Sequence, residues 1–271
     1  MTSMRGQGQA APRVFGASRA FLVRAQDIGE ADRRLVFFTE SSGVLAAAAK
    51  SARKSRKRFG GALQKFLLLD IAWTERGSGM PVLASASLVE SFWDIVESWD
   101  KVRHADYILE LAAGLFPQPG PKPKAFALLL RLLSALSSGE LPESVARKAE
   151  GSFLSLGGWG PALAACRQCG REAGANPARK GVERPSFRFV VSEGGLRCWR
   201  CAPPGGSGAL LSPGAIRTWR AIQSASPAAL GRLRIQDSIL EELQGIIPEY
   251  LEWCLGRQFR SIAREIPSRK P

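Results

Sequence analysis

The chain has 271 residues, with 38 Lys and Arg against 24 Asp and Glu, which gives a formal net charge of +14. Because 45% of the residues are hydrophobic, the chain can bury one large core or two modest ones, and disorder of the whole chain is excluded. No window approaches the roughly 18 uninterrupted apolar residues that a membrane-spanning helix needs.

The N-terminal segment, residues 1–17, is expected to be a flexible tail. It carries Arg5 and Arg13 but lacks the apolar stretch of a secretory signal. The sequence therefore predicts a cytoplasmic protein.

Five segments rich in β-forming residues follow the tail, and turn residues separate them. They cover about Ala20–Gln26, Arg34–Thr39, Val44–Lys50, Leu63–Thr74 and Val82–Glu90. Five strands in some seventy residues are too few for an immunoglobulin sandwich and favour a small closed barrel. Residues 18–91 are therefore predicted to form an OB-fold domain.

A basic run lies where the third predicted strand ends. Six cations occupy the nine positions 50–58, and residues 1–60 carry an excess of eight positive charges. Side chains that repel one another in this way bind a polyanion by releasing its condensed counterions. Taken alone, the run is equally compatible with a solvated basic loop or, in a eukaryote, a nuclear-import signal.

The hydrophobic period changes to that of helices from about Phe92. One or two helices are predicted between about Phe92 and the Pro-rich segment that begins at Gln118. Further helices are predicted at about Lys124 to Leu136, Pro142–Leu156, Pro213–Ser224 and Ile239–Arg264. Ser212 and Pro213 form a helix-start signal, whereas Pro248 is expected to kink or divide the last helix. The predicted fold class is α+β: an N-terminal OB-fold β-barrel followed by an all-α domain, residues 92–271, that carries a four-cysteine zinc module.

Four of the five cysteines form two Cys-x-x-Cys pairs, Cys166 with Cys169 and Cys198 with Cys201, with 28 residues between the pairs. This spacing lets four thiolates surround one ion, so it predicts a structural zinc site in an insertion at about 163–205. A disulfide scaffold and a thioredoxin-like redox pair are the alternatives. A site closed by four thiolates has no open position for water, so the zinc is not expected to be catalytic.

Catalytic signatures are missing from the sequence. It contains neither a phosphate-binding G-x-x-x-x-G-K-[ST] loop nor a G-x-S-x-G elbow, and its carboxylates are scattered. The only histidine, His104, is placed at the polar or boundary side of a helix, and Cys254 is expected to be a buried core thiol. We therefore predict that the protein is not an enzyme.

The order of these motifs resembles the bacterial RecO family of DNA repair proteins, the recombination mediators of the RecFOR pathway. The likeness is strongest over 27–66, which contains the turn Gly29-Glu-Ala-Asp32, the basic run and Arg58-Phe-Gly-Gly-Ala-Leu-Gln64. It covers about residues 18–265 and includes both cysteine pairs. Among the departures, Ser51 stands where the family usually has Gly.

The resemblance implies an OB barrel that binds single- and double-stranded DNA, and annealing of complementary strands without ATP. It also implies two protein partners, RecR and the acidic, hydrophobic C-terminal tail of single-stranded DNA-binding protein. With them, such a protein loads recombinase onto coated single-stranded gaps, at the nucleoid.

The residues predicted to hold phosphates are cations on and beside the basic run. They are Arg33, Arg34, Lys50, Arg53, Lys54, Arg56, Lys57, Arg58 and Lys65. Phe37, Phe38, Phe59 and Phe66 are candidates for stacking on bases, although strand aromatics usually belong to a core. Arg131, on the helix through Phe126 and Leu130, is the candidate cation for the partner tail, with a solvated arginine as the alternative.

Two other functional classes remain open from the residues alone. An OB barrel with a basic loop serves RNA as well as DNA, so a zinc-containing RNA-binding or RNA-processing protein is one alternative. A structural adaptor whose charge keeps it soluble is the other.

Overall fold

The computed structural model describes residues 15–52, 59, 61–75, 79–173, 187–202 and 208–256. The chain divides into two compact units. The first, the barrel unit, runs to Ser91 and includes Pro119–Pro121, and the second, the helical unit, contains the remainder. Among the described residues, no helix has both the length and the apolar character needed to cross a bilayer.

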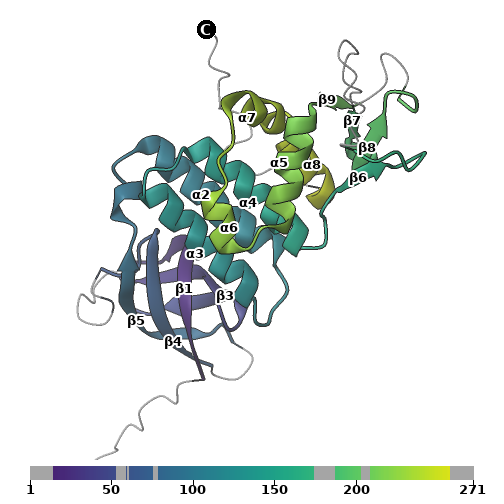
Figure 1. Cartoon of the computed structure of the whole chain (residues 1–271). Coiled ribbons are helices and arrows are strands. Elements are labelled where there is room, and N and C mark those ends of the chain that lie inside the picture. Colours follow the sequence, from purple (N-terminus) through teal and green to yellow (C-terminus); the bar gives the residue numbers. More distant parts are fainter. Residues whose placement is uncertain are drawn as a thin grey trace, which may run out of the picture. The chain divides into compact units, whose positions relative to one another are not determined.

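Five strands form the closed barrel of the first unit (Figure 1). They are β1 (Gly16–Ile28), β2 (Asp32–Thr39), β3 (Gly43–Ala49), β4 (Leu67–Thr74) and β5 (Val82–Ser91). Their order is β1-β2-β3-β5-β4. An antiparallel pairing of β1 with β4 and a parallel pairing of β3 with β5 close the barrel. This is the predicted OB-like barrel followed by helices, so the predicted fold class is confirmed.

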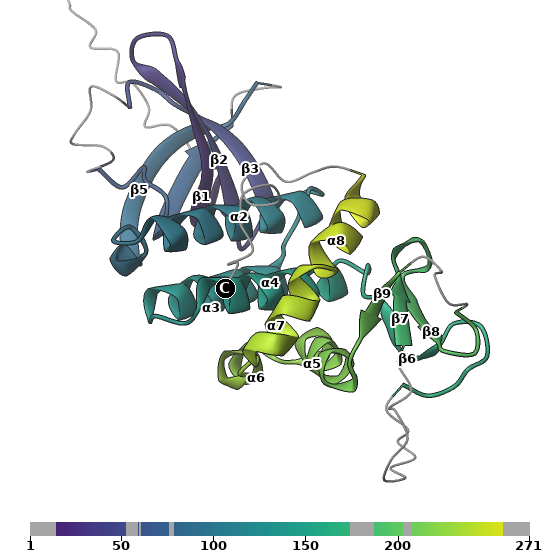
Figure 2. The same ribbon diagram turned by 90° about the horizontal axis from the view of Figure 1, so that it is seen from above.

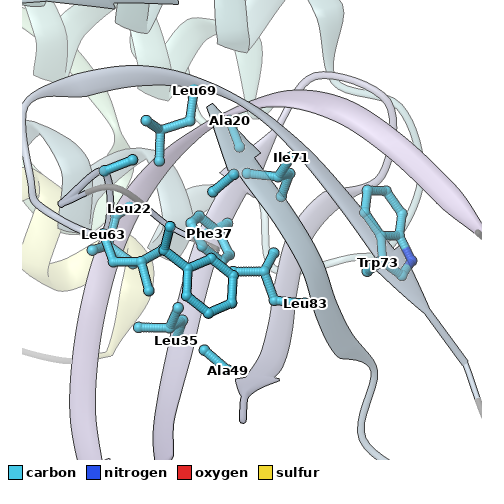
Figure 3. Packing of buried hydrophobic residues seen from close by; sticks show 13 residues of the cluster. Ala20, Leu22, Leu35, Phe37, Ala49, Leu63, Leu69, Ile71, Trp73 and Leu83 are labelled. Carbon is cyan, nitrogen blue, oxygen red and sulfur yellow. The ribbon is translucent and has the colours of Figure 1, made fainter. Parts of the chain in front are cut away.

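Alternate residues of the strands fill the barrel, as Figure 3 shows for Leu35, Phe37, Leu69, Ile71 and Leu83. These side chains point inward because successive residues of a strand face opposite sides of the sheet. The segments rich in β-forming residues that predicted the strands therefore supply this one core.

Two strand starts were predicted wrongly. β1 begins at Gly16 rather than Ala20, and the indole ring of Trp73 occupies the space that a Cβ at Gly16 would need. β4 begins at Leu67 rather than Leu63, because the φ angle of Phe66 is 63° and breaks the extended backbone. Local apolar composition did not reveal this turn.

The second unit contains seven α-helices among its described residues. They are α2 (Trp99–Leu115), α3 (Pro123–Ser137), α4 (Pro142–Leu156), α5 (Pro213–Ser224), α6 (Pro227–Arg232), α7 (Asp237–Gln244) and α8 (Ile247–Leu255), and a 3-10 turn, η1 (Trp93–Ile95), precedes them. The Ser212 hydroxyl accepts the amide of Ala215 at 3.1 Å, which confirms the predicted start of α5. The predicted last helix is divided into α7 and α8, with Pro248 in the first turn of α8.

Helix α4 is buried along its length, from Ser144 to Leu154, because α2, α3, α5, α7 and α8 all pack against it. Its polar side chains are paired inside the unit. The Arg147 guanidinium binds Glu150 Oε1 at 2.7 Å, and the Tyr107 hydroxyl donates to the same oxygen at 2.6 Å. Burial raises the pKa of Glu150, while Arg147 opposes that shift.

A small four-stranded sheet projects from the helices beside α5 and α8, as Figures 1 and 2 show. It contains β6 (Ala162–Cys166), β7 (Phe187–Val190), β8 (Gly195–Cys198) and β9 (Ala209–Leu211), in the order β6-β8-β7-β9. The Phe189 ring of β7 lies 4.9 Å from the Trp219 ring of α5 and 5.3 Å from the Tyr250 ring of α8, measured between centroids. These aromatic contacts anchor the sheet to the helices.

Candidate nucleic-acid interface and metal centre

Three of the four described cations of the predicted DNA site lie at or beside the start of β2: Arg33, Arg34 and Lys50. In the β2–β3 register, Arg33 is opposite Ala49, the last residue of β3, so Arg33 lies beside the start of the basic run. Arg33 Nη1 donates to the carbonyl of Leu63 at 3.5 Å, beyond the run. The structure therefore brings Arg33 close to the chain on both sides of the run. The other predicted cations of the run lie outside the described residues: Arg53, Lys54, Arg56, Lys57 and Arg58.

The other described cations differ in their surroundings. Arg34 is exposed, and strand alternation points it to the face opposite that of Arg33 and Leu35. Lys65 is half-buried and lies two residues before β4. Arg34 is therefore a neighbour of Arg33 in sequence without sharing its side of the sheet.

An acidic residue that sequence reasoning missed anchors the start of the run. Asp32 Oδ2 accepts Lys50 Nζ at 2.7 Å, and its Oδ1 accepts the backbone amide of Ser51 at 2.8 Å. These two hydrogen bonds, that from Lys50 first, lower the pKa of Asp32. Asp32 thus keeps its charge and competes with phosphate for Lys50.

Ser51 has a φ angle of 54°, in the left-handed region where a side chain costs about 1–2 kcal/mol and glycine costs little. Glycine adopts this backbone conformation without that cost, so glycine would suit this position. In this chain, the hydrogen bond from the Ser51 amide to Asp32 stabilises the turn.

The aromatic candidates for base stacking are core residues. Phe37 and Phe38 are fully buried, and Phe59 and Phe66 are no more than 5% exposed. Phe59 belongs to the barrel core together with Leu63. None of the four rings presents a face to solvent, so the stacking hypothesis is wrong for this conformation.

The four paired cysteines come together in the small sheet. Cys166 ends β6 and Cys198 ends β8, and these two strands pair in parallel. The four sulfur atoms all lie within 4.8 Å of one another, and Cys169 Sγ is 3.6 Å from Cys198 Sγ. That separation is far longer than the roughly 2.05 Å of a disulfide, and all five cysteines are free thiols in this structure.

Backbone amides around the cysteines favour ionised sulfur. Burial opposes ionisation of Cys166, but amide hydrogen bonds from Cys198, Cys169 and Gln168 outweigh it and lower the pKa of the thiol to about 6. The hydrogen bond with Cys169 raises the pKa of Cys201 to about 12. Four clustered thiols with one readily ionised member suit a soft divalent metal, so the group is a possible metal-binding site.

His104 differs from its prediction. It is buried, with 1% exposure, and its Nδ1 donates to the carbonyl of Asp100 at 2.8 Å. With Asp100 and Glu143 it forms a second cluster of potential metal ligands at the starts of α2 and α4. Arg103 already binds the Asp100 carboxylate at 2.8 Å, and its positive charge opposes a second cation, so we assign no metal there.

Cys254 and Arg131 are the remaining predicted residues in the helical unit. Cys254 is half-buried rather than part of the core, and burial raises the pKa of its thiol. Arg131 is exposed on α3, with its guanidinium against Gly231 of α6, where it fills the space that a Cβ would take.

Comparison with known proteins gives one consistent result. The family model "Recombination protein O N terminal" matches residues 17–92, and "Recombination protein O C terminal" matches residues 96–263. The DNA repair protein RecO of Anaeromyxobacter sp. (strain K) is 33% identical over 238 residues, which are 88% of this chain and 90% of that protein. That of Moorella thermoacetica is 30% identical over 254 residues, 93% of this chain and 90% of its own length, and that of Dehalococcoides mccartyi is 28% identical over 245 residues, 90% and 92% respectively.

The OB-like barrel, the helical unit and these matches define a non-enzymatic protein of DNA repair and recombination. Both family models fall in the expected order and together span most of the chain. The chain belongs to the RecO family.

Proposed function

We propose that this chain is a DNA-binding recombination mediator. It binds single- and double-stranded DNA through the barrel unit, anneals complementary strands without nucleotide, and helps load recombinase onto gaps coated by single-stranded DNA-binding protein. The observation that carries this proposal is the position of Arg33, which contacts the chain beyond the basic run and lies beside its start. Neutralising phosphates of two strands on one surface lowers their mutual repulsion and lets them pair.

The phosphate-binding residues that we propose are those predicted from the sequence. They are Arg33, Arg34, Lys50, Arg53, Lys54, Arg56, Lys57, Arg58 and Lys65. Arg34 and Lys50 are exposed cations of the described part of this set. A protein that binds DNA in this way is expected at the nucleoid.

Replacing Arg56, Lys57 and Arg58 together with Ala tests the barrel site. Affinity for DNA is expected to fall at least tenfold at low salt, and the slope of log affinity against log salt should flatten by roughly 2–3, about 0.7–0.9 for each lost phosphate contact. The readout is fluorescence anisotropy with labelled single strand, duplex and RNA, followed by annealing without nucleotide.

The matched control replaces Arg217, Arg220 and Arg232, which are arginines of the helical unit outside the proposed site, with Ala. An unchanged salt slope in the loop variant would reject the run as the site. Preference for RNA over both DNA forms would instead favour the RNA-binding alternative.

We propose that the four clustered cysteines hold one structural zinc ion. Cys166, Cys169, Cys198 and Cys201 would supply four thiolates, the donor set of closed structural zinc sites. Bound zinc would cross-link the two Cys-x-x-Cys turns, and this chain's own strands β6 and β8 already present the first cysteine of each pair side by side.

RecR and the tail of single-stranded DNA-binding protein are the partners that we propose. For the tail, Arg131 is the proposed cation, because an acidic peptide with a hydrophobic end needs a positive charge beside apolar surface. Contact with Gly231 holds the Arg131 guanidinium at the edge of α6.

Arg131→Ala is expected to weaken binding of a synthetic tail peptide about five- to tenfold, as loss of a charge-assisted contact would do. Gly231→Ala should weaken binding in the same direction, because its methyl group displaces the guanidinium. Isothermal titration is the measurement, with Arg220→Ala as the control. A peptide affinity equal to the parent's in Arg131→Ala would remove this residue from the site.

A further inference from the structure

A second cationic surface surrounds the cysteine cluster. We give the name knuckle surface to five of the exposed residues that lie in or directly beside the two Cys-x-x-Cys turns. They are Arg167, Gln168, Arg171, Trp199 and Arg200. The 3.6 Å approach of Cys169 Sγ to Cys198 Sγ brings the two turns together.

Trp199 is the centre of this surface. Trp199 is 50% exposed, whereas an apolar group as large as an indole ring is usually buried. The guanidinium carbon of Arg200 lies 4.9 Å from the ring centroid, and that of Arg171 lies 5.9 Å from it. An exposed aromatic ring with two arginines stacked on it combines base-stacking and phosphate-binding groups in one place.

Arg171 and Arg200 differ from Arg197 of the small sheet in having no carboxylate partner among the sheet's described residues. Arg197 binds Glu193 at 2.8 Å and Arg188 donates to the carbonyl of Gly208 at 2.9 Å, so both are used within the sheet. Arg171 and Arg200 have no ion pair within the described ranges 162–173 and 187–202. Their positive charge is not neutralised by a carboxylate there.

The whole segment that forms the sheet is basic. Residues 162–211 contain eight Arg and Lys against three Glu, an excess of five positive charges. A zinc ion with four thiolates would carry two negative charges, which leaves an excess of three. The segment therefore attracts a polyanion whether or not metal is bound.

We propose that the knuckle surface binds single-stranded DNA, with an unpaired base stacked on Trp199 and the flanking phosphates bound by Arg171 and Arg200. Unpaired nucleotides fit better than duplex, because base pairing hides the faces of the bases inside the helix. An arginine that leaves the ring to bind phosphate gives up only an exposed cation–π contact, which is weaker than stacking of a base. This inference rests on the proposed function, to which it adds a contact outside the barrel.

Trp199→Ala tests the stacking. Its affinity for a 20-nucleotide oligothymidine is expected to fall roughly 5- to 50-fold, as loss of one base stack would do, with duplex affinity changed less than about twofold. Trp199→Phe should recover most of the loss because it restores a π face. Fluorescence anisotropy at fixed salt measures both, and Trp99→Ala is the matched control, since Trp99 is 76% exposed but lies on α2.

Arg171→Ala combined with Arg200→Ala tests the phosphate contacts. The salt slope for single-stranded DNA should flatten by about 1.4, which is about 0.7 for each lost contact. Bound zinc and the thermal melting point are measured on every variant. If Trp199→Ala loses its metal, Trp199→Phe and the double arginine variant carry the test.

Single-strand affinity equal to the parent's in a metal-bound Trp199→Ala protein would overturn the inference. Equal losses for single strand and duplex would also overturn it, because stacking needs unpaired bases. Either result would leave the proposed function intact, provided that the parent protein binds DNA and that replacing Arg56, Lys57 and Arg58 with Ala weakens this binding. A parent that ignores all oligonucleotides would reject the proposed function itself.

Discussion

Trp219→Ala is expected to lower the free energy of unfolding of the helical unit by about 3–5 kcal/mol, the usual loss for a large buried aromatic. Trp219 is fully buried on α5, and its ring contacts those of Phe189 and Tyr250. Truncation therefore leaves a cavity where the small sheet joins the helices. Urea unfolding followed by circular dichroism measures the change.

Trp219→Phe separates lost volume from lost aromatic contact. Trp219 Nε1 is buried without a hydrogen-bond partner among the described residues, so its removal costs no hydrogen bond there. The Phe variant should lose about half as much stability as the Ala variant, in keeping with its smaller cavity. A loss below about 1 kcal/mol for Trp219→Ala would show that the aromatic contacts do not anchor the sheet.

The second large effect is expected when the cysteine cluster loses its metal, because the small sheet then loses stability. Cys198→Ser should reduce bound zinc from about one ion per chain to a small fraction after dialysis, because three thiolates and a hydroxyl bind zinc more weakly than four thiolates. The small sheet should then lose protection from hydrogen exchange over β6–β8. Elemental analysis and exchange mass spectrometry measure the two effects, and DNA binding by the barrel should persist.

Cys254→Ser is the matched control, because Cys254 is a free thiol outside the cluster. Its zinc content should equal the parent's. Substantially less than one zinc per parent chain after dialysis would contradict a four-thiolate zinc site, and Cys198→Ser with undiminished metal would exclude Cys198 as a ligand.

Local patterns predicted the parts of the fold that depend on local chemistry. Segments rich in β-forming residues, separated by turn residues, indicated the barrel strands. Ser212 and Pro248 marked helix boundaries that the structure confirms. The cysteine spacing predicted the cluster because two-residue gaps produce tight turns regardless of the surrounding fold.

The errors came from tertiary contacts. His104 is buried only because α4 packs on α2, and the strands β6–β9 are short segments stabilised by pairing with one another. The Asp32–Lys50 ion pair joins residues far apart in the sequence, so no local window shows it. Phe59 is a candidate for base stacking from its position beside the basic run, with a core position as the alternative, and the structure places it in the barrel core.

The buried pair in α4 restricts how this chain can change. Replacing Arg147 alone leaves the Glu150 carboxylate without its cation in an apolar interior, and replacing Glu150 alone strands a guanidinium there. Either single step is harmful, whereas apolar side chains of matched volume at both positions are tolerable. Substitutions at positions 147 and 150 are therefore expected to occur together during evolution. Tyr107 should change with them, because its hydroxyl binds the same oxygen of Glu150.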